Sequence, residues 1–273
     1  MRFHKYQGAG NDFLIADNRD GSLNLTTSQI ASLCDRRYGV GADGLMLLEK
    51  SESADFRMVY FNSDGSGGMM CGNGGRCIVA FASDLGLDHF DFDAADGFHS
   101  AEILEDREGV KTVRLKMKDV TEILRYDVLD NVSVPADGFF LDTGTRHYVR
   151  FVNDLENYDI VSEGRHIRMN ASELLPIGVN VNFVEPVGGV IKVRTYEKGV
   201  EDETFACGTG IVASCVASFV SGIAPAITDS ATGRVRYVVQ AKRDMLAVDF
   251  IPAEPASDVW LTGPATHVAE III

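Results

Sequence analysis

The sequence predicts an α+β protein of two pseudo-symmetric domains, each a curved, mostly antiparallel sheet around one central helix. Three observations support this fold class: an internal repeat, two similar cysteine–glycine turns that each precede a helix-forming segment, and many short strand-like segments separated by turns. A doubly wound parallel fold needs a helix between most strands, and the sequence lacks that alternation. A length of 273 residues also suits two domains.

The internal repeat has an offset of 136 positions. It relates Cys71-Gly72-Asn73-Gly74 to Cys207-Gly208-Thr209-Gly210 (207 minus 71). The same offset relates three further pairs of landmarks, which are Tyr60 and Tyr196, Asn11 and His147, and Gly44 and Asn180. Because four landmarks keep one gapless offset in the same order, we expect two structurally similar halves.

Each cysteine–glycine turn leads into a predicted helix of small and apolar residues. These segments are 75–82 in the first half and 211–219 in the second. A helix N-terminus has unpaired N–H groups and a partial positive charge, so it acidifies a thiol and binds a carboxylate. We interpret Cys71 and Cys207 as reactive thiols. A small buried residue is the alternative for each, but such a residue needs no glycine turn beside it. For Cys34, Cys77 and Cys215 we favour packing.

The predicted strands are separated by turn signals such as those in residues 63–68. They are Phe13–Asp17, Leu45–Glu49, Arg57–Phe61, Val113–Met117, Tyr148–Val152, Val190–Tyr196, Val235–Val239 and Met245–Phe250. We expect the linker between the two halves near Lys118–Ile123.

Composition and motifs exclude several classes of function. The net charge is −15, from 25 basic and 40 acidic residues, so we expect no nucleic-acid partner. No apolar stretch approaches the roughly 20 residues of a membrane span, and the N-terminal residues lack the apolar core of a signal peptide. Five cysteines without a secretory signal fit free thiols in a reducing cytoplasm. The cysteine and histidine spacings favour no metal site, and no phosphate-binding loop is present.

Further candidate site residues lie at or near the repeat landmarks. A thiol needs a neighbouring group to activate it as a base near neutral pH. We interpret His147 and Glu197 as the residues that activate the thiols. An ordinary surface or buried role is the alternative for each. Four asparagines near glycines provide uncharged donors and acceptors, namely Asn11, Asn62, Asn73 and Asn180. Turn formation is the alternative for each. As a set, these amides suit a site that holds the carboxylate and ammonium groups of an amino acid.

Two thiols on opposite faces of one carbon can invert it, because one thiolate removes a proton while the other thiol delivers one. The helix starts at Gly72–Asn73 and Gly208–Thr209 would place N–H groups on the α-carboxylate of the amino acid. No pyridoxal lysine is needed, so we expect no cofactor. Closure of the two domains would bring the thiols together.

Motifs along nearly the whole chain resemble those of the diaminopimelate epimerase family. They are residues 8–13 (GAGNDF), 35–44 (DRRYGVGADG), 60–66 (YFNSDGS), 71–77 (CGNGGRC), 203–210 (ETFACGTG) and 261–265 (LTGPA). Members of that family are cofactor-independent isomerases of lysine and peptidoglycan precursor synthesis. The resemblance therefore implies that the chain inverts the α-carbon of LL-diaminopimelate to the meso form.

The resemblance also implies roles and an organisation. Cys71 and Cys207 would be the acid and base, His147 and Glu197 would tune them, and the four asparagines with Lys198 would hold the substrate. It implies a homodimer. It also implies a final segment that returns to the first domain, so that the domains are 1–118 plus 262–273, carrying the first thiol, and 119–261, carrying the second.

Three positions depart from the family pattern. Lys198 stands where the family generally has arginine, Thr145-Arg146 replaces an Asn-Pro pair, and Gly44 replaces a common glutamine. Lysine offers a point charge where arginine offers a two-pronged fork, and we expect Arg146 to supply the missing guanidinium. Two alternatives stay open at this point: a related two-cysteine racemase of another amino acid, and an inactive amino-acid-binding protein.

Overall fold

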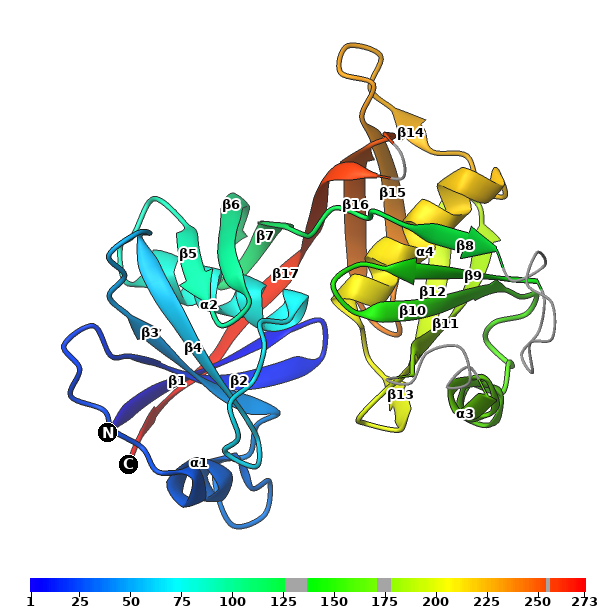
Figure 1. The fold of residues 1–273 in the computed structure, drawn as a ribbon. Helices are drawn as coiled ribbons and strands as arrows, with labels where there is room; N and C mark the ends of the chain where they lie inside the picture. Colours follow the sequence, from blue (N-terminus) through cyan, green and yellow to red (C-terminus); the bar gives the residue numbers. More distant parts are fainter. Residues whose placement is uncertain (126–136, 171–177, 254–255) are drawn as a thin grey trace. The chain divides into compact units, whose positions relative to one another are not determined.

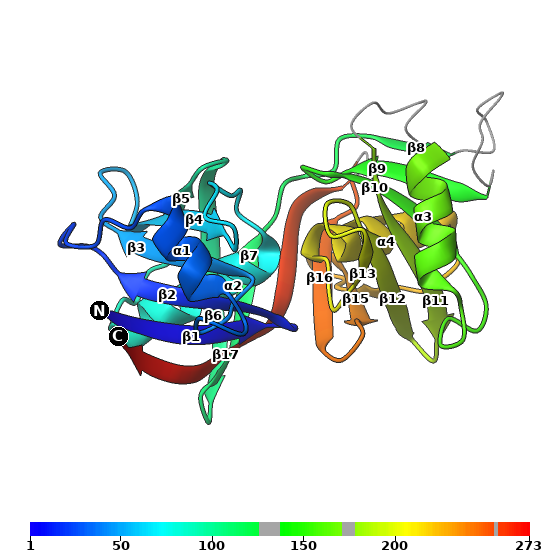
Figure 2. The same ribbon diagram turned by 90° about the horizontal axis from the view of Figure 1, so that it is seen from below.

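The computed structural model describes residues 1–125, 137–170, 178–253 and 256–273 (Figures 1 and 2). The chain divides into two compact units. Unit 1 comprises Met1–Lys116 and Thr262–Ile273, and unit 2 comprises Met117–Leu261. The long strand β17 (Ser257–Ile272) contributes its first residues to unit 2 and the remainder to unit 1.

Unit 1 is a curved sheet that closes on itself. Its elements are β1 (Arg2–Gly8), β2 (Asn11–Asp17), α1 (Thr27–Cys34), β3 (Gly44–Glu49), β4 (Phe56–Asn62), α2 (Gly72–Asp84), β5 (Asp91–Ala94), β6 (Gly97–Arg107) and β7 (Val110–Lys116). Neighbouring strands pair in chain order, with β2–β3 and β4–β5 parallel and the other pairs antiparallel. Strand β17 pairs with β1 and with β7, which closes the sheet into a barrel.

Helix α2 runs through the inside of this barrel (Figure 1). Every residue from Gly72 to Ala82 is buried. The helix contacts strands from both the first and the last part of the barrel, namely β1, β2, β3, β6 and β7. A helix surrounded on all sides needs small or apolar residues on every face, which explains the composition of this segment. Helix α1 packs outside the barrel, where Ile30 and Cys34 join a core with Phe3 and Leu45.

Unit 2 repeats this plan around α4 (Gly208–Ser221). Its other elements are β8 (Ile123–Arg125), β9 (Gly138–Asp142), β10 (Arg146–Phe151), α3 (Ile160–Asn170), β11 (Asn180–Val187), β12 (Val190–Glu197), β13 (Asp202–Thr204), β14 (Ile227–Thr228), β15 (Val235–Gln240) and β16 (Met245–Ile251). The pairs β10–β11 and β12–β15 are parallel, and the pairs β8–β9, β9–β10, β11–β12, β12–β13, β14–β15 and β15–β16 are antiparallel.

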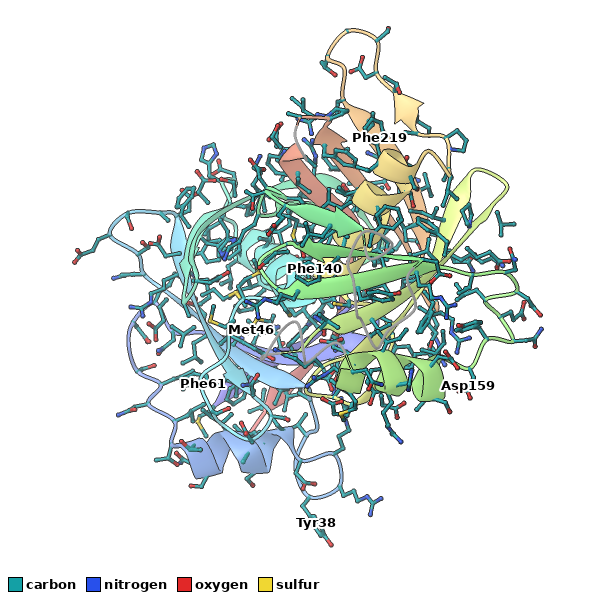
Figure 3. All side chains as sticks on the ribbon, turned by 45° about the vertical axis from the view of Figure 1, so that its right-hand side comes forward. Tyr38, Met46, Phe61, Phe140, Asp159 and Phe219 are labelled. Atoms are coloured by element: carbon teal, nitrogen blue, oxygen red, sulfur yellow. The ribbon has the colours of Figure 1, made fainter. Side chains whose placement is uncertain are left out.

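The inner and outer helices of unit 2 differ in burial. Helix α4 contacts β9, β10, β11, β12 and β16 and is buried from Gly210 to Ser218. Helix α3 covers the other face of the sheet, where Ile160 and Ile167 pack on Phe183 and Tyr196. Figure 3 shows side chains filling the space between each sheet and its helices, whereas Tyr38 extends from the exposed loop after α1.

All the strands predicted from the sequence are present, as are both helices that follow the cysteines. The gapless offset, however, is wrong at the level of strand register. Gly44 lies opposite Phe13, but its predicted counterpart Asn180 lies opposite His147. A constant offset would place the partner of Asn180 two residues further along β10. The register of the second half is therefore shifted, and Asn182 occupies the place that corresponds to Gly44.

Candidate active site

The first candidate thiol caps the inner helix of unit 1. Cys71 is the N-cap of α2 and has an extended backbone, and its Sγ accepts a hydrogen bond from the Gly74 N–H at 3.3 Å. The side chain is exposed. The N–H groups of the first turn, beginning at Gly72, have no partner within the helix itself. The geometry therefore places an accessible sulfur beside a site that favours negative charge.

A chain of amides supports this helix start. The buried Asn73 donates to Asn11 Oδ1 at 2.6 Å, and Asn11 in turn donates to Asp43 Oδ2 at 3.0 Å. Arg76, which is fully buried, donates to Asn73 Oδ1 at 2.8 Å and to the carbonyl of Gly72 at 3.2 Å. Asn73 is therefore held by Arg76, and its amide in turn fixes the orientation of the Asn11 side chain. Arg76 was not among the residues predicted for the site, although an arginine inside a helix of otherwise small and apolar residues is a signal for it.

The remaining predicted residues of unit 1 lie at the end of β4. Asn62 donates to Ser66 Oγ at 3.0 Å within the turn that follows the strand. Gly44 lies opposite Asn62, and a Cβ atom there would lie 2.5 Å from the ring of Tyr60 and 2.6 Å from the Phe61 carbonyl oxygen. The tyrosine ring and the strand backbone therefore occupy the space of a side chain at position 44, which explains why this position has glycine.

The second candidate thiol caps the inner helix of unit 2. Cys207 is the N-cap of α4, and it is buried, with 8% of its surface exposed. Its Sγ lies 3.5 Å from the Thr209 hydroxyl. The two sulfurs therefore have different hydrogen-bond partners, a backbone N–H for Cys71 and a side-chain hydroxyl for Cys207.

His147 is completely buried beside the start of α4. Its Nε2 lies 3.0 Å from Thr209 Oγ1 and 2.9 Å from Thr145 Oγ1. Burial lowers the pKa of His147 to about 3, so the imidazole is neutral near neutral pH. The structure brings His147 to Cys207 through the Thr209 hydroxyl.

Two residues that the sequence analysis missed complete the surroundings of His147. Asn182 Nδ2 lies 3.1 Å from His147 Nδ1 and donates to the Tyr148 carbonyl at 3.2 Å. Thr195 donates to Asn182 Oδ1 at 2.9 Å. The signal for Asn182 was strand alternation, because residues two apart in a strand share a face and Asn180 was already a candidate.

Asn180 connects the ends of two strands. Its side chain donates to the Arg146 carbonyl at 3.3 Å and accepts from the Lys198 N–H at 2.9 Å. The Arg146 Nη1 atom is buried and has no hydrogen-bond partner among the residues that the structure describes. A buried polar atom without a partner is rare in proteins, so this place can accept an anionic group.

Glu197 is the last residue of β12. Its Oε2 accepts from the Thr204 hydroxyl at 2.8 Å, which ties the carboxylate to the adjacent strand β13. In unit 1 the structure thus gathers Cys71, Asn11 and Asn73 at one helix start. In unit 2 it gathers Cys207, Thr209 and His147.

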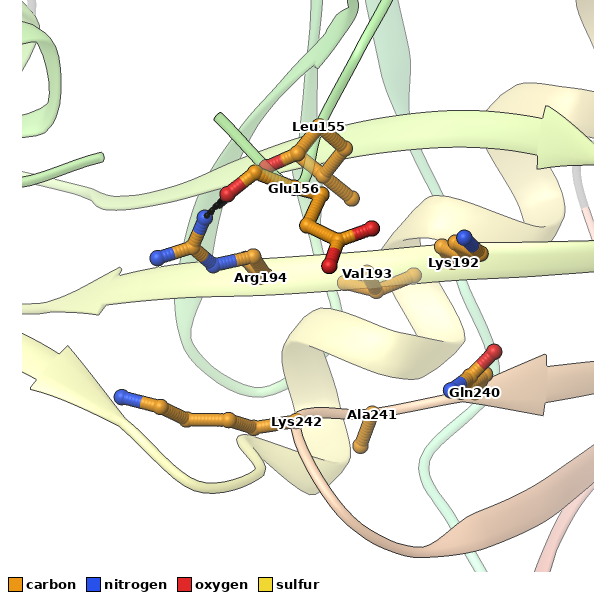
Figure 4. Close-up of a pocket in the computed structure, with 8 residues that line it drawn as sticks. All are labelled: Leu155, Glu156, Lys192, Val193, Arg194, Gln240, Ala241 and Lys242. Atoms are coloured by element: carbon orange, nitrogen blue, oxygen red, sulfur yellow. Dashed lines mark hydrogen bonds between the residues drawn. The ribbon is translucent and has the colours of Figure 1, made fainter. Parts of the chain in front are cut away.

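A pocket elsewhere in unit 2 is distinct from these groups. Figure 4 shows it between β12 and the end of β15, with Arg194 and Lys242 among its lining residues. Both cations bind Glu203, the arginine by two hydrogen bonds and the lysine at 3.0 Å. Both cations thus share one carboxylate within the protein, and none of the residues predicted for the site lines this pocket.

The described residues include neither a metal-binding cluster nor a membrane-spanning helix. No three histidine, cysteine, aspartate or glutamate side chains among them are grouped so as to hold a metal ion. No helix in the part of the chain that the structure covers is long and apolar enough to cross a membrane.

Comparison with known proteins gives a consistent result. A family model described as diaminopimelate epimerase matches residues 3–120 and 139–248. A diaminopimelate epimerase of Chlorobaculum tepidum is 45% identical, over 96% of this chain and 96% of the relative. One of Flavobacterium psychrophilum is 41% identical over 100% of both chains.

Two solved structures share this fold with the chain at low sequence identity. A phenazine biosynthesis protein of the PhzF family from Bacillus anthracis has a TM-score of 0.70 at 15% identity, over 100% of this chain and 99% of the other. A probable proline racemase from Agrobacterium radiobacter has a TM-score of 0.69 at 15% identity, over 100% and 92%. These likenesses confirm the predicted α+β fold class.

Proposed function

This chain belongs to the diaminopimelate epimerase family, and on that premise we propose that Cys71 and Cys207 are the acid and base that invert the α-carbon of diaminopimelate. The chain is an isomerase of diaminopimelate, as the family match and the named relatives establish. The observation that supports the proposal best is that each thiol caps the N-terminus of the central helix of its unit.

The proposed reaction exchanges one proton on each face of the α-carbon. One thiolate takes the α-proton and becomes a thiol, while the other thiol gives its proton to the opposite face and becomes a thiolate. The α C–H is a much weaker acid than a thiol, so the negative charge that spreads into the carboxylate needs stabilisation. The N–H groups at Gly72–Asn73 and Gly208–Thr209 would provide it, because helix N-termini bind anions.

We propose supporting roles for the residues around the thiols. His147 is neutral and contacts Thr209, so it acts on Cys207 through that hydroxyl. Glu197, held by Thr204, would tune the same site. In unit 1, Asn11 and Asn62 would hold polar groups of the substrate.

Arg146 and Lys198 would bind the distal carboxylate of diaminopimelate. Asn180 ties the backbones of these two residues together, and neither side chain makes an ion pair with any residue that the structure places. In a chain with a net charge of −15, two cationic residues whose backbones bond the same asparagine, and which lack acidic partners among the described residues, are notable. A carboxylate is the group that satisfies both.

Truncation of each cation tests this assignment. We expect Arg146→Ala and Lys198→Ala each to lower kcat/KM for diaminopimelate by roughly tenfold to hundredfold, because a charged hydrogen bond contributes roughly 1.5–3 kcal/mol. Lys198→Arg should retain or improve activity. Arg37→Ala, at an exposed arginine of unit 1, is the control. If both truncated variants turn over diaminopimelate as the parent does, the distal carboxylate binds elsewhere.

We also propose a cytoplasmic homodimer. The reaction needs two reduced thiols, which a reducing compartment maintains, and the family resemblance implies two chains. Light scattering that gives the mass of a single chain would contradict the dimer.

A further inference from the structure

One continuous series of hydrogen bonds leads from the sheet of unit 2 to the catalytic sulfur. In order, its members are Thr195, Asn182, His147, Thr209 and Cys207, joined at 2.9, 3.1, 3.0 and 3.5 Å. The first three are buried, with exposures of 3%, 0% and 0%. Water therefore has little access to the inner links, and their direction is fixed by the protein.

The chemistry of the partners fixes the direction of each bond. The Tyr148 carbonyl can only accept, and the Thr195 hydroxyl donates to Asn182 Oδ1, so the amide nitrogen of Asn182 faces His147 Nδ1. An amide nitrogen can only donate. Nδ1 is therefore an acceptor, and the proton of the neutral imidazole is on Nε2.

The protonated Nε2 then determines what the Thr209 hydroxyl can do. The Nε2–H is directed at Thr209 Oγ1 and at Thr145 Oγ1. Since a protonated Nε2 cannot accept, the hydrogen of the Thr209 hydroxyl has two acceptors within reach, Thr145 Oγ1 at 3.2 Å and Cys207 Sγ at 3.5 Å. When the sulfur is a thiolate it carries the negative charge, so it is the stronger acceptor of the two. A hydroxyl that donates to sulfur stabilises the thiolate relative to the thiol.

We propose that Asn182 and Thr195 are positioning residues that hold His147 as the Nε2–H tautomer and so make Thr209 a hydrogen-bond donor to the Cys207 thiolate. The inference rests on the proposed function of Cys207. It assigns the histidine a fixed orienting role in place of direct proton transfer with the sulfur. It also makes the two thiols unequal, because Cys71 receives a backbone N–H.

The first experiment reads the tautomer directly. Nitrogen-15 NMR of the histidine-labelled wild-type protein should show His147 Nε2 protonated and Nδ1 as an unprotonated acceptor. A spectrum with the proton on Nδ1 would overturn the proposal, because Nε2 would then be an acceptor and could take the Thr209 hydrogen from Cys207.

The second experiment compares two substitutions of Thr195. Thr195→Val keeps the shape of the side chain and removes the donor to Asn182, whereas Thr195→Ser keeps the hydroxyl. We expect the valine variant to lower kcat and the rate of Cys207 alkylation by iodoacetamide about three- to tenfold, with little change in KM. The serine variant should restore both. Alkylation of Cys71, measured by peptide mapping of the same sample, should stay constant and is the internal control.

Asn182→Leu extends this test, since it removes the donor to His147 Nδ1, and we expect a loss of at least tenfold in the same two rates. If it fails to fold, the Thr195 pair still decides. Equal Cys207 alkylation in the valine and serine variants, with epimerase activity present, would refute the positioning role. Lack of epimerase activity in the wild type, with the alkylation pattern as expected, would refute the proposed function instead.

Discussion

A single methyl group at Gly210 should break the hydrogen-bond series around His147. Gly210 is buried in the first turn of α4, and a Cβ atom built there would overlap Asn182 Oδ1 and lie 3.3 Å from His147 Cε1. Neither neighbour can move away easily, because both are enclosed in unit 2. We therefore expect Gly210→Ala to displace the Asn182 side chain.

The magnitude follows from the groups that lose partners. Alanine in a helix gains about 1 kcal/mol over glycine, but overpacking costs about 1–3 kcal/mol. Displacement of Asn182 also weakens its bonds to His147, Tyr148 and Thr195, and each buried polar group left without a partner costs about 1–3 kcal/mol. The net loss of unfolding free energy should be about 2–5 kcal/mol, or a melting temperature lower by roughly 5–15 °C.

The equivalent position in unit 1 provides a matched control. A Cβ atom at Gly74 would lie 3.3 Å from Cys71 Sγ and no closer than 3.5 Å to the flexible Met46 and Met58 side chains. Gly74→Ala should therefore retain the wild-type melting temperature or raise it slightly. Thermal unfolding followed by circular dichroism compares the two variants. If Gly210→Ala is as stable as Gly74→Ala, the packing argument for the network is wrong.

Two further predictions concern pH and redox state. Burial lowers the pKa of His147 from 6.5 to about 3, so the unfolded chain binds a proton that the native chain does not. Stability should fall as pH is lowered from about 6.5 towards 3, by up to about 1.4 kcal/mol per pH unit from this residue. His147→Gln should show a smaller loss between pH 7 and 5 in urea unfolding, and an unchanged loss would contradict the burial argument. Thiols that act on one carbon must come close together, so mild oxidation should join Cys71 to Cys207 and inactivate the enzyme reversibly. A peptide map that pairs either with Cys34, Cys77 or Cys215 would contradict that geometry.

Local sequence signals predicted the parts of the site that depend on local structure. The glycine turns, the helices that follow Cys71 and Cys207, and the strands around Tyr60 and Tyr196 are all present. Helix starts and alternating strands are determined within a few residues, so one sequence suffices for them.

Features that depend on strand pairing were missed. Asn182 was overlooked because the constant offset of 136 paired Gly44 with Asn180. The register of the second half is shifted by two residues, and this shift is set by how the sheet closes. Strand β17 was missed because Gly263-Pro264 indicates a turn in isolation. In the structure the Pro264 carbonyl instead accepts a bond from Arg76, on the helix inside unit 1. The register shift and the pairing of β17 both depend on residues far apart in the sequence.

The most direct test of the two-thiol reaction is the source of the hydrogen in the first product. LL-diaminopimelate is incubated with the enzyme in deuterated water, and substrate and product are analysed by mass spectrometry before a tenth of the substrate has reacted. If Cys71 and Cys207 act on opposite faces, the product carries solvent deuterium at the inverted carbon while the remaining substrate keeps its hydrogen, and Cys71→Ala and Cys207→Ala give no product. Product that retains the hydrogen of the substrate, or turnover near wild type in either variant, would contradict the account.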